Sequence, residues 1–238
     1  MNIVTKLLRK SLKLEYCGAV IVAAGTASRM GGIDKVMAEL QGEPMIVRTV
    51  RTFQNCDAIK EIVIVTRGDL LPKVQALCSG FSKVKAVVTG GADRSESVRN
   101  GLNALSEKVE LVAVQDGARP LITDAVITRT VSAAWDCGAA APGVPVKDTV
   151  KIVQDGSVVE TPDRSSLMAI QTPQVFGLRL LKDALEAAKA ENALITDDCS
   201  AVERMGVAVK IVEGDEKNMK VTTPMDLKIA AILLEETK

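Results

Sequence analysis

A loop of small residues with two cations follows the first apolar run of the chain. Residues 19–24 form this short run, and residues 25–35 behind it hold three glycines together with Arg29 and Lys35. Small residues let backbone N–H groups approach a ligand closely, and cationic side chains attract phosphates, so the pattern favours a phosphate-binding loop. The loop has neither the Gly-Lys-Ser/Thr of a P-loop nor the G-x-G-x-x-G of a dinucleotide fingerprint. Taken alone, it would more often be a surface turn with solvated cations.

Two more loops of the same kind follow later apolar runs. One follows residues 84–88 and the other follows residues 110–115, and both combine glycines with charged side chains. Their candidate site residues are Gly91, Arg94, Ser97, Asp116, Gly117 and Arg119. Loops at the carboxyl ends of the strands of an open parallel sheet line a single ligand crevice. We therefore expect all three loops to share one edge of a sheet.

Asp116 is the candidate metal ligand of these loops. A carboxylate acting together with phosphate oxygens is the usual environment of Mg²⁺ in proteins. A structural ion pair between Asp116 and Arg119, three residues further on, explains the two residues equally well when they are considered alone.

The elements that must position these loops alternate along the chain. Apolar runs cover residues 19–24, 61–66, 84–88, 110–115 and 207–212, and helical patterns lie near residues 44–55, 70–78, 94–106, 123–136 and 178–190. The runs are continuously apolar rather than alternating, which predicts strands buried on both faces. We therefore expect an α/β fold with a mostly parallel twisted sheet flanked by helices.

A predicted hairpin interrupts this alternation. Residues 146–153 and 157–160 flank Asp155-Gly156, which is a typical two-residue hairpin turn. A hairpin inserted into a parallel sheet normally points away from it. The pattern therefore predicts a projecting β-hairpin arm at about residues 145–170.

Charge and aromatic content exclude two classes of partner. The chain has 238 residues, and its 30 Lys and Arg residues are balanced by 30 Asp and Glu residues. No overall positive field would draw it onto nucleic acid or an anionic membrane. Aromatic residues make up 2% of the chain, too few to stack successive bases. We expect neither a nucleic acid nor a membrane as partner.

The absence of histidine restricts the chemistry further. It excludes Ser-His-Asp and Cys-His nucleophiles and histidine-ligated metals. The five cysteines are far apart and include no C-x-x-C pair, so we interpret them as small buried residues of a cytoplasmic protein.

The basic N-terminus superficially imitates a secretory leader. Four cations between residues 6 and 13 precede the apolar residues 19–24, but this run is short and ends in the glycine-rich loop. We interpret residues 1–17 as a basic N-terminal extension and residues 18–238 as a single domain.

Eight spaced motifs resemble one known family. Besides residues 23–35 and the two loops above, they include residues 145–149, 163–167, 171–174, 195–198 and 218–224, which read PVKDT, DRSSL, QTPQ, ITDD and NMKVTTP. In this order they resemble the 2-C-methyl-D-erythritol 4-phosphate cytidylyltransferases, over residues 18 to about 236. The resemblance implies a Rossmann-like nucleotidyltransferase fold, Mg²⁺ or another divalent cation, and a homodimer formed through the 145–170 arm. It also implies CMP transfer from CTP to the sugar-alcohol phosphate, with release of pyrophosphate, in isoprenoid precursor synthesis.

The resemblance also assigns roles to individual residues. The implied catalytic residues are Lys35, Lys220 and Arg29. The implied CTP-binding residues are Ala23, Ala24, Gly25, Gly91, Arg94, Ser97 and Asp116, and the last of these is also the metal ligand. The implied acceptor-binding residues are Gly117, Arg119, Thr149, Arg164 and Thr196. The first loop departs from the family pattern at Ala27, Ser28 and Asp34, where a glycine, a basic residue and a proline are common.

Two alternatives remain open from the sequence. A pentitol (ribitol) phosphate cytidylyltransferase looks similar through the Lys220 motif. A regulatory protein that binds CTP without turnover would keep the same pocket.

Overall fold

The computed structural model describes residues 16–25 and 36–235. Its main sheet has eight strands in the order β10-β7-β11-β6-β1-β4-β5, with β12 paired to β7. The strands are β1 (Cys17–Ala23), β4 (Ile59–Thr66), β5 (Val84–Thr89), β6 (Leu111–Asp116), β7 (Ala139–Pro145), β10 (Met168–Ile170), β11 (Gln174–Gly177) and β12 (Lys210–Glu213). The pairs β1–β4, β1–β6, β4–β5 and β7–β12 are parallel, while β11 and β10 pair antiparallel to their neighbours. The predicted mostly parallel α/β sheet is confirmed.

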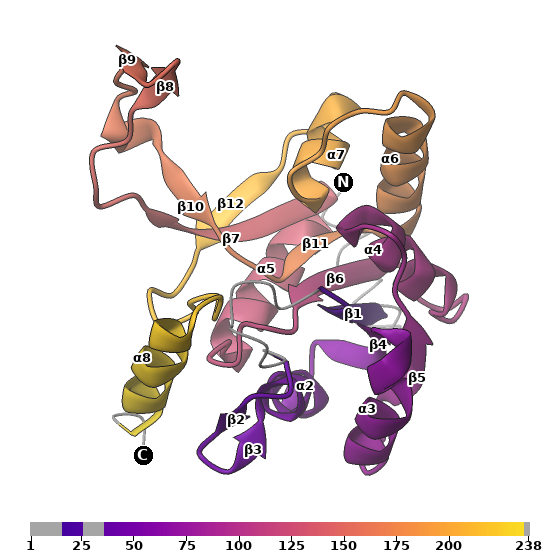
Figure 1. The fold of residues 1–238 in the computed structure, drawn as a ribbon. Helices are drawn as coiled ribbons and strands as arrows, with labels where there is room; N and C mark the ends of the chain where they lie inside the picture. The colour runs from indigo at the N-terminus through magenta and orange to yellow at the C-terminus, as the bar shows by residue number, and fades with distance from the viewer. Residues whose placement is uncertain (1–15, 26–35, 236–238) are drawn as a thin grey trace.

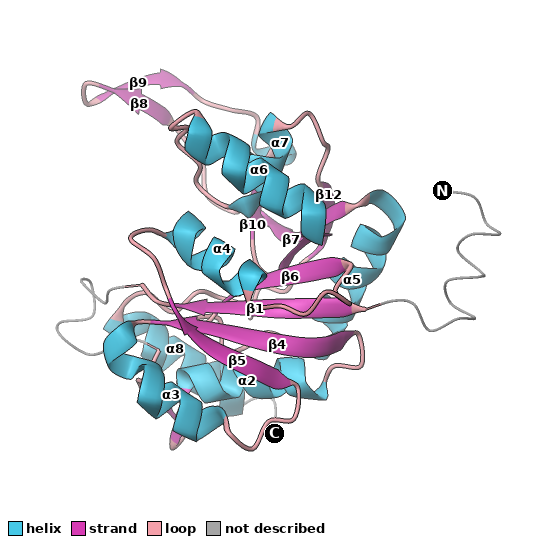
Figure 2. Ribbon diagram, turned by 90° about the vertical axis from the view of Figure 1, so that its right-hand side faces the viewer, coloured by secondary structure: helices cyan, strands magenta, loops and turns pink. Residues whose placement is uncertain are grey.

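Helices cover both faces of this sheet (Figure 2). They are α2 (Met45–Asn55), α3 (Leu71–Cys78), α4 (Arg94–Asn103), α5 (Asp124–Cys137), α6 (Leu178–Ala190), α7 (Asp198–Arg204) and α8 (Pro224–Glu235). In β1, Ala19 and Ile21 pack towards α2, α3 and α5, whereas Val20 packs towards α4, α6 and α7. Burial on both sides explains why the central strands are continuously apolar. None of the helices that the structure describes has the length and apolar character needed to cross a membrane.

Several predicted boundaries shift in the structure. The strand expected at residues 207–212 is β12 at Lys210–Glu213, and the helix expected at residues 94–106 ends at Asn103. β1 begins at Cys17, so the last residue of the predicted N-terminal extension belongs to the first strand. Residues 1–15 of that extension lie outside the described residues.

The predicted hairpin is present but shorter than expected. Its strands are β8 (Ile152–Gln154) and β9 (Ser157–Glu160), so residues 146–151, which the pattern assigned to its first strand, are not part of β8. Asp155 and Gly156 have φ of 49° and 79°, as a type I′ turn requires. Every residue of both strands is exposed, and Figure 1 shows the pair lying away from the main sheet. The segment leaves the sheet after β7 and returns to it at β10.

Two smaller elements complete the fold. β2 (Glu39–Leu40) and β3 (Glu43–Pro44) form a two-stranded ribbon before α2. Helix α8 packs against this ribbon through a small apolar cluster that contains Leu40, Val221 and Ala230. This packing holds the chain directly after Lys220, where Val221 also donates its N–H to the carbonyl of Ala118 at 2.8 Å.

Candidate active site

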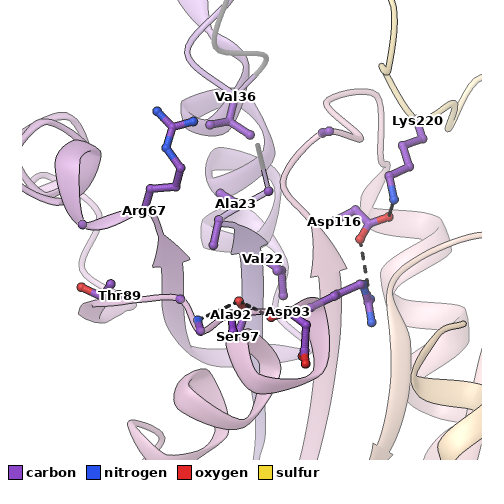
Figure 3. Close-up of a pocket in the computed structure, with 17 residues that line it drawn as sticks. Val22, Ala23, Val36, Arg67, Thr89, Ala92, Asp93, Ser97, Asp116 and Lys220 are labelled. Carbon is purple, nitrogen blue, oxygen red and sulfur yellow. Dashed lines mark hydrogen bonds and ion pairs between the residues drawn. The ribbon is translucent and has the colours of Figure 1, made fainter. Parts of the chain in front are cut away.

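A pocket of about 480 Å³ opens at the carboxyl ends of β1, β4, β5 and β6. It is lined by eight of the predicted site residues, namely Ala23, Ala24, Gly25, Gly91, Arg94, Ser97, Asp116 and Lys220. Figure 3 shows Asp116 and Lys220 pointing towards one another on one side of this pocket, with Arg67 on the opposite side. The loops after β1, β5 and β6 therefore share one edge, as the alternation of strands and helices predicted.

The loop after β5 has little room for larger residues. A Cβ on Gly91 would collide with the side chain of Glu96, and one on Gly90 would lie 2.8 Å from Ser97 Oγ. Asp93 begins α4 by accepting a hydrogen bond from the N–H of Glu96 at 2.8 Å, which is an ordinary N-cap. The loop is thus fixed by its own residues before any ligand arrives.

Ser97 has a structural function in that loop. Its hydroxyl accepts a hydrogen bond from the N–H of Gly91 at 3.0 Å and donates one to the carbonyl of Asp93 at 2.8 Å. A hydroxyl has one donor and two acceptor positions, so one lone pair of Ser97 is left for a ligand. The side chain both lines the pocket and holds its wall.

Asp116 lies at the centre of a charged cluster. Its carboxylate is 2.8 Å from Lys220 Nζ, 3.6 Å from Arg94 Nη2 and 3.8 Å from Arg119 Nε. Burial alone would raise the pKa of Asp116, but the attraction of Lys220 and Arg94 outweighs it and holds the pKa below its ordinary value. Asp116 is therefore an ionised carboxylate at neutral pH, surrounded by cations.

Arg119 does not line the pocket. Its Nη1 donates a hydrogen bond to the carbonyl of Asn218 at 2.6 Å, and its side chain is 12% exposed. Burial lowers the pKa of Arg119 more than Asp116 raises it. Arg119 thus connects Asp116 to the segment that carries Lys220. Gly117 also lies outside the pocket, with its N–H donated to the carbonyl of Val22 at 2.8 Å.

The remaining predicted acceptor residues lie apart from this pocket. Thr149 and Arg164 belong to the segment between β7 and β10, and both are exposed. Arg164 donates a hydrogen bond to the carbonyl of Lys147 at 2.9 Å. Thr196 is exposed just before α7, and its N–H is donated to Ser200 Oγ at 3.1 Å. The two predicted catalytic residues Arg29 and Lys35 lie outside the described residues.

The segment of residues 171–174 holds the backbone around the site in place through hydrogen bonds. Sequence reasoning missed this function. Thr172 Oγ1 accepts a hydrogen bond from the N–H of Asp116 at 3.1 Å. The amide of Gln171 bonds both the N–H and the carbonyl of Asp215, at 3.2 and 2.8 Å, on the way to Lys220. Gln174 Oε1 accepts hydrogen bonds from the N–H groups of Asp198 and Cys199, both at 3.1 Å. The signal available in the sequence was three polar residues within four positions. The structure buries all three of them.

Sequence reasoning also missed the wall opposite Lys220. Arg67, Gly68 and Thr89 line the pocket there, at the ends of β4 and β5. Arg67 forms an ion pair with Asp69 at 2.8 Å. The strand that ends at Thr66 is followed by Arg67 and not by an acidic residue that could bind a ribose.

Comparisons with known proteins agree with this geometry. A model of the 2-C-methyl-D-erythritol 4-phosphate cytidylyltransferase family matches residues 17–236. The protein of that name from Symbiobacterium thermophilum is 48% identical over 219 residues, which cover 91% of this chain and 92% of the relative. The protein of the same name from Geobacillus kaustophilus is 46% identical over 219 residues, which cover 91% of this chain and 96% of that relative.

A solved structure extends the likeness to the fold. The 4-diphosphocytidyl-2C-methyl-D-erythritol synthase of Anaerococcus prevotii has a TM-score of 0.85 with this chain at 30% identity, over 93% of this chain and 99% of the other. Family model, sequence relatives and fold all cover nearly the whole chain. The chain therefore belongs to the 2-C-methyl-D-erythritol 4-phosphate cytidylyltransferase family.

Proposed function

We propose that the protein transfers CMP from CTP to 2-C-methyl-D-erythritol 4-phosphate, releasing pyrophosphate and forming 4-diphosphocytidyl-2-C-methyl-D-erythritol for isoprenoid synthesis. As a member of this family the chain is a cytidylyltransferase. The observation that carries the proposal is the pocket in which small-residue loops face the cluster of Lys220, Asp116 and Arg94. Such a pocket suits a polyanionic nucleotide, since close backbone N–H groups and cations both stabilise phosphate oxygens.

The reaction needs no basic side chain. An oxygen of the acceptor phosphate attacks the α-phosphorus of CTP, and the bond from that phosphorus to the oxygen bridging to the β-phosphate breaks. Pyrophosphate leaves with the electron pair of that bond. The second pKa of a phosphate monoester is about 6, so the attacking oxygen is already ionised near neutral pH. A chain without histidine can therefore catalyse the transfer.

Catalysis then consists of alignment and charge neutralisation. Lys220 supplies a cation to the pocket, and its side chain is 41% exposed, so it is accessible to a ligand. The loop from Gly91 to Ser97 supplies the wall that we assign to cytosine. By the family pattern, Arg29 and Lys35 add two more cations from the first loop.

Asp116 is the residue that would hold Mg²⁺. The described residues contain no group of three or more acidic or cysteine side chains that could form a protein cage for a metal. A single buried carboxylate beside a phosphate pocket fits Mg²⁺, which takes one or two carboxylates together with substrate phosphates. When bound, the ion would neutralise charge on the triphosphate.

We also propose a homodimer in which the arm between β7 and β10 completes the neighbouring site. The exposed side chains of β8 and β9 include Ile152, Val153, Val158 and Val159. An exposed apolar hairpin calls for a partner surface, and a twofold dimer is the simplest one. Arg164 and Thr149 lie on this arm, away from the pocket of their own chain. The dimer would bring them to the acceptor phosphate in the other subunit.

The cysteines support a cytoplasmic location. Among the described residues all five are free thiols, and four of them are buried. A reducing compartment preserves such thiols.

Pyrophosphate release tests the function and its alternatives together. We expect release from CTP only when 2-C-methyl-D-erythritol 4-phosphate is added, and much less release with ribitol phosphate. Preference for ribitol phosphate would support the pentitol enzyme instead. CTP binding without any release would support a regulatory protein.

A further inference from the structure

A buried carboxylate that does not line the pocket contacts Arg94 through a different guanidinium nitrogen from the one near Asp116. Asp198 is the first residue of α7 and is 1% exposed. Its Oδ2 lies 2.8 Å from Arg94 Nη1, while Arg94 Nη2 lies 3.6 Å from Asp116 Oδ1. One guanidinium is thus shared between carboxylates that are 82 residues apart in the chain.

Burying this carboxylate is costly. Among the described residues, neither oxygen of Asp198 accepts a hydrogen bond of good geometry, so the ion pair with Arg94 is its main compensation. Burial raises the pKa of Asp198 in spite of the attraction of Arg94. A whole buried ion pair can often be replaced by neutral side chains of similar size without loss of stability, whereas removing one partner alone leaves the other charge unpaired. The pair as a whole is therefore not required for the stability of the fold.

The backbone around Asp198 is held firmly. Gln174 accepts hydrogen bonds from the N–H groups of Asp198 and Cys199, and its amide nitrogen donates to Asp197 Oδ2 at 2.7 Å. Asp197 in turn caps α7 by accepting a hydrogen bond from the N–H of Ser200 at 2.9 Å. These contacts direct the carboxylate of Asp198 towards Arg94 before any ligand binds.

We infer that Asp198 is a positioning residue, which holds the guanidinium of Arg94 away from full pairing with Asp116 and orients it for CTP. The inference rests on one part of the proposed function, namely that the pocket binds CTP. Without Asp198, Arg94 would form a closer pair with Asp116, because a guanidinium and a carboxylate favour two parallel hydrogen bonds. The arginine would then be less available to the nucleotide.

The variant Asp198→Asn tests this inference because it removes the charge and keeps the shape. We expect the KM for CTP to rise about tenfold, with kcat and the KM for the acceptor changed less than about threefold. Arg94 keeps Asp116 as a counter-charge in this variant, so the thermal unfolding midpoint should fall little. Glu203→Gln, which neutralises an exposed carboxylate on the same helix, should change none of these values. Asp198→Ser serves the same purpose if Asp198→Asn does not fold.

A double-mutant cycle with Arg94→Ala shows whether Asp198 acts through Arg94. In the Arg94→Ala background, Asp198→Asn should change the KM for CTP by less than about twofold. An undiminished effect in that background, or an unchanged KM in the single variant, would overturn the inference. So would a lowered unfolding midpoint with the KM for CTP unaltered.

Direct binding of CTP, measured by titration calorimetry, separates this inference from the proposed function. If the wild-type protein binds CTP but releases no pyrophosphate with the acceptor, the proposed function fails. In that case a weaker CTP affinity of Asp198→Asn would still support the positioning of Arg94. An unchanged affinity would refute it.

Discussion

Lys220 Nζ lies 2.8 Å from Asp116 Oδ2, so the proposed catalytic cation and the candidate metal ligand neutralise one another. If the proposed site is right, a triphosphate would compete with Asp116 for Lys220, and a divalent ion would compete with Lys220 for Asp116. Binding of the nucleotide with its metal would then exchange one set of ion pairs for another. Such an exchange would leave no buried charge without a partner, which would keep its cost low.

Lys220→Ala should lower kcat by about 10² to 10³, the size of effect seen when one preorganised donor to a developing charge is removed. Pyrophosphate release under saturating CTP and acceptor measures it. Lys210→Ala, which removes an exposed lysine of β12, is the control and should retain full activity. Full activity in Lys220→Ala would refute the role assigned to this lysine.

Asp116→Asn should make stability less dependent on acid pH. Since the pKa of Asp116 is lowered in the folded protein, the ionised carboxylate stabilises the fold above the ordinary carboxyl pKa of about 4. That stabilisation is lost as the pH falls through the lower value of the folded state. Denaturant unfolding should show the wild type more stable by about 1 to 3 kcal/mol at pH 7, with the difference shrinking below pH 4.

The exposed residue Asp148 provides the control for the pH dependence of stability in Asp116→Asn. Asp148→Asn should follow the wild type at every pH. A difference between Asp116→Asn and wild type that stayed constant from pH 7 to pH 3 would contradict the assignment of an ionised, stabilising Asp116.

Ser97→Ala should weaken the preference for CTP over UTP roughly five- to tenfold, because the N–H of Gly91 loses its acceptor and the base-side wall loosens. The measurement is kcat/KM with each nucleotide. Ser95→Ala on the same helix is a matched control, since Ser95 does not line this pocket. Equal losses for both nucleotides would show that Ser97 supports the loop without contributing to base selection.

The Arg164→Ala homodimer and the Lys35→Ala homodimer should each have low activity. Mixing the two variants under conditions of subunit exchange should restore activity. In the mixed dimer, the subunit that keeps Lys35 receives an intact Arg164 from its neighbour, and one complete site forms. The other site lacks both residues. Arg179→Ala, which removes an exposed arginine of α6, should need no such rescue. Exchange without recovered activity, or a monomer in solution, would contradict the proposed arm-mediated dimer.

The strands that could be predicted from the sequence are those in which an apolar run coincides with a strand that is at least partly buried in the sheet. β1, β4, β5 and β6 each contain a run of β-branched or other apolar residues, and their loops carry the glycines and charges that identified the pocket. β7 was missed because its sequence, AAAPGVP, is rich in residues with low β propensity. Its pairing with β10, β11 and β12 makes it a strand in spite of this composition.

The site was predicted less completely than the fold. Asp198 appeared within a quoted motif, yet no pattern in the sequence indicated that its carboxylate reaches Arg94 across the molecule. Its neighbour Asp197 did carry a local signal, since an acidic N-cap with Ser200 three residues later is a helix start. Long-range pairing depends on how α7 packs, which spacing along the chain does not encode.

The segment of residues 171–174 has a consequence for how the site tolerates substitution. Through Gln171, Thr172 and Gln174 it contacts the segment before Lys220, the backbone of Asp116 and the start of α7. All three contacts come from four consecutive residues. A substitution that displaces this short segment should therefore disturb both sides of the site together, although none of its residues lines the pocket.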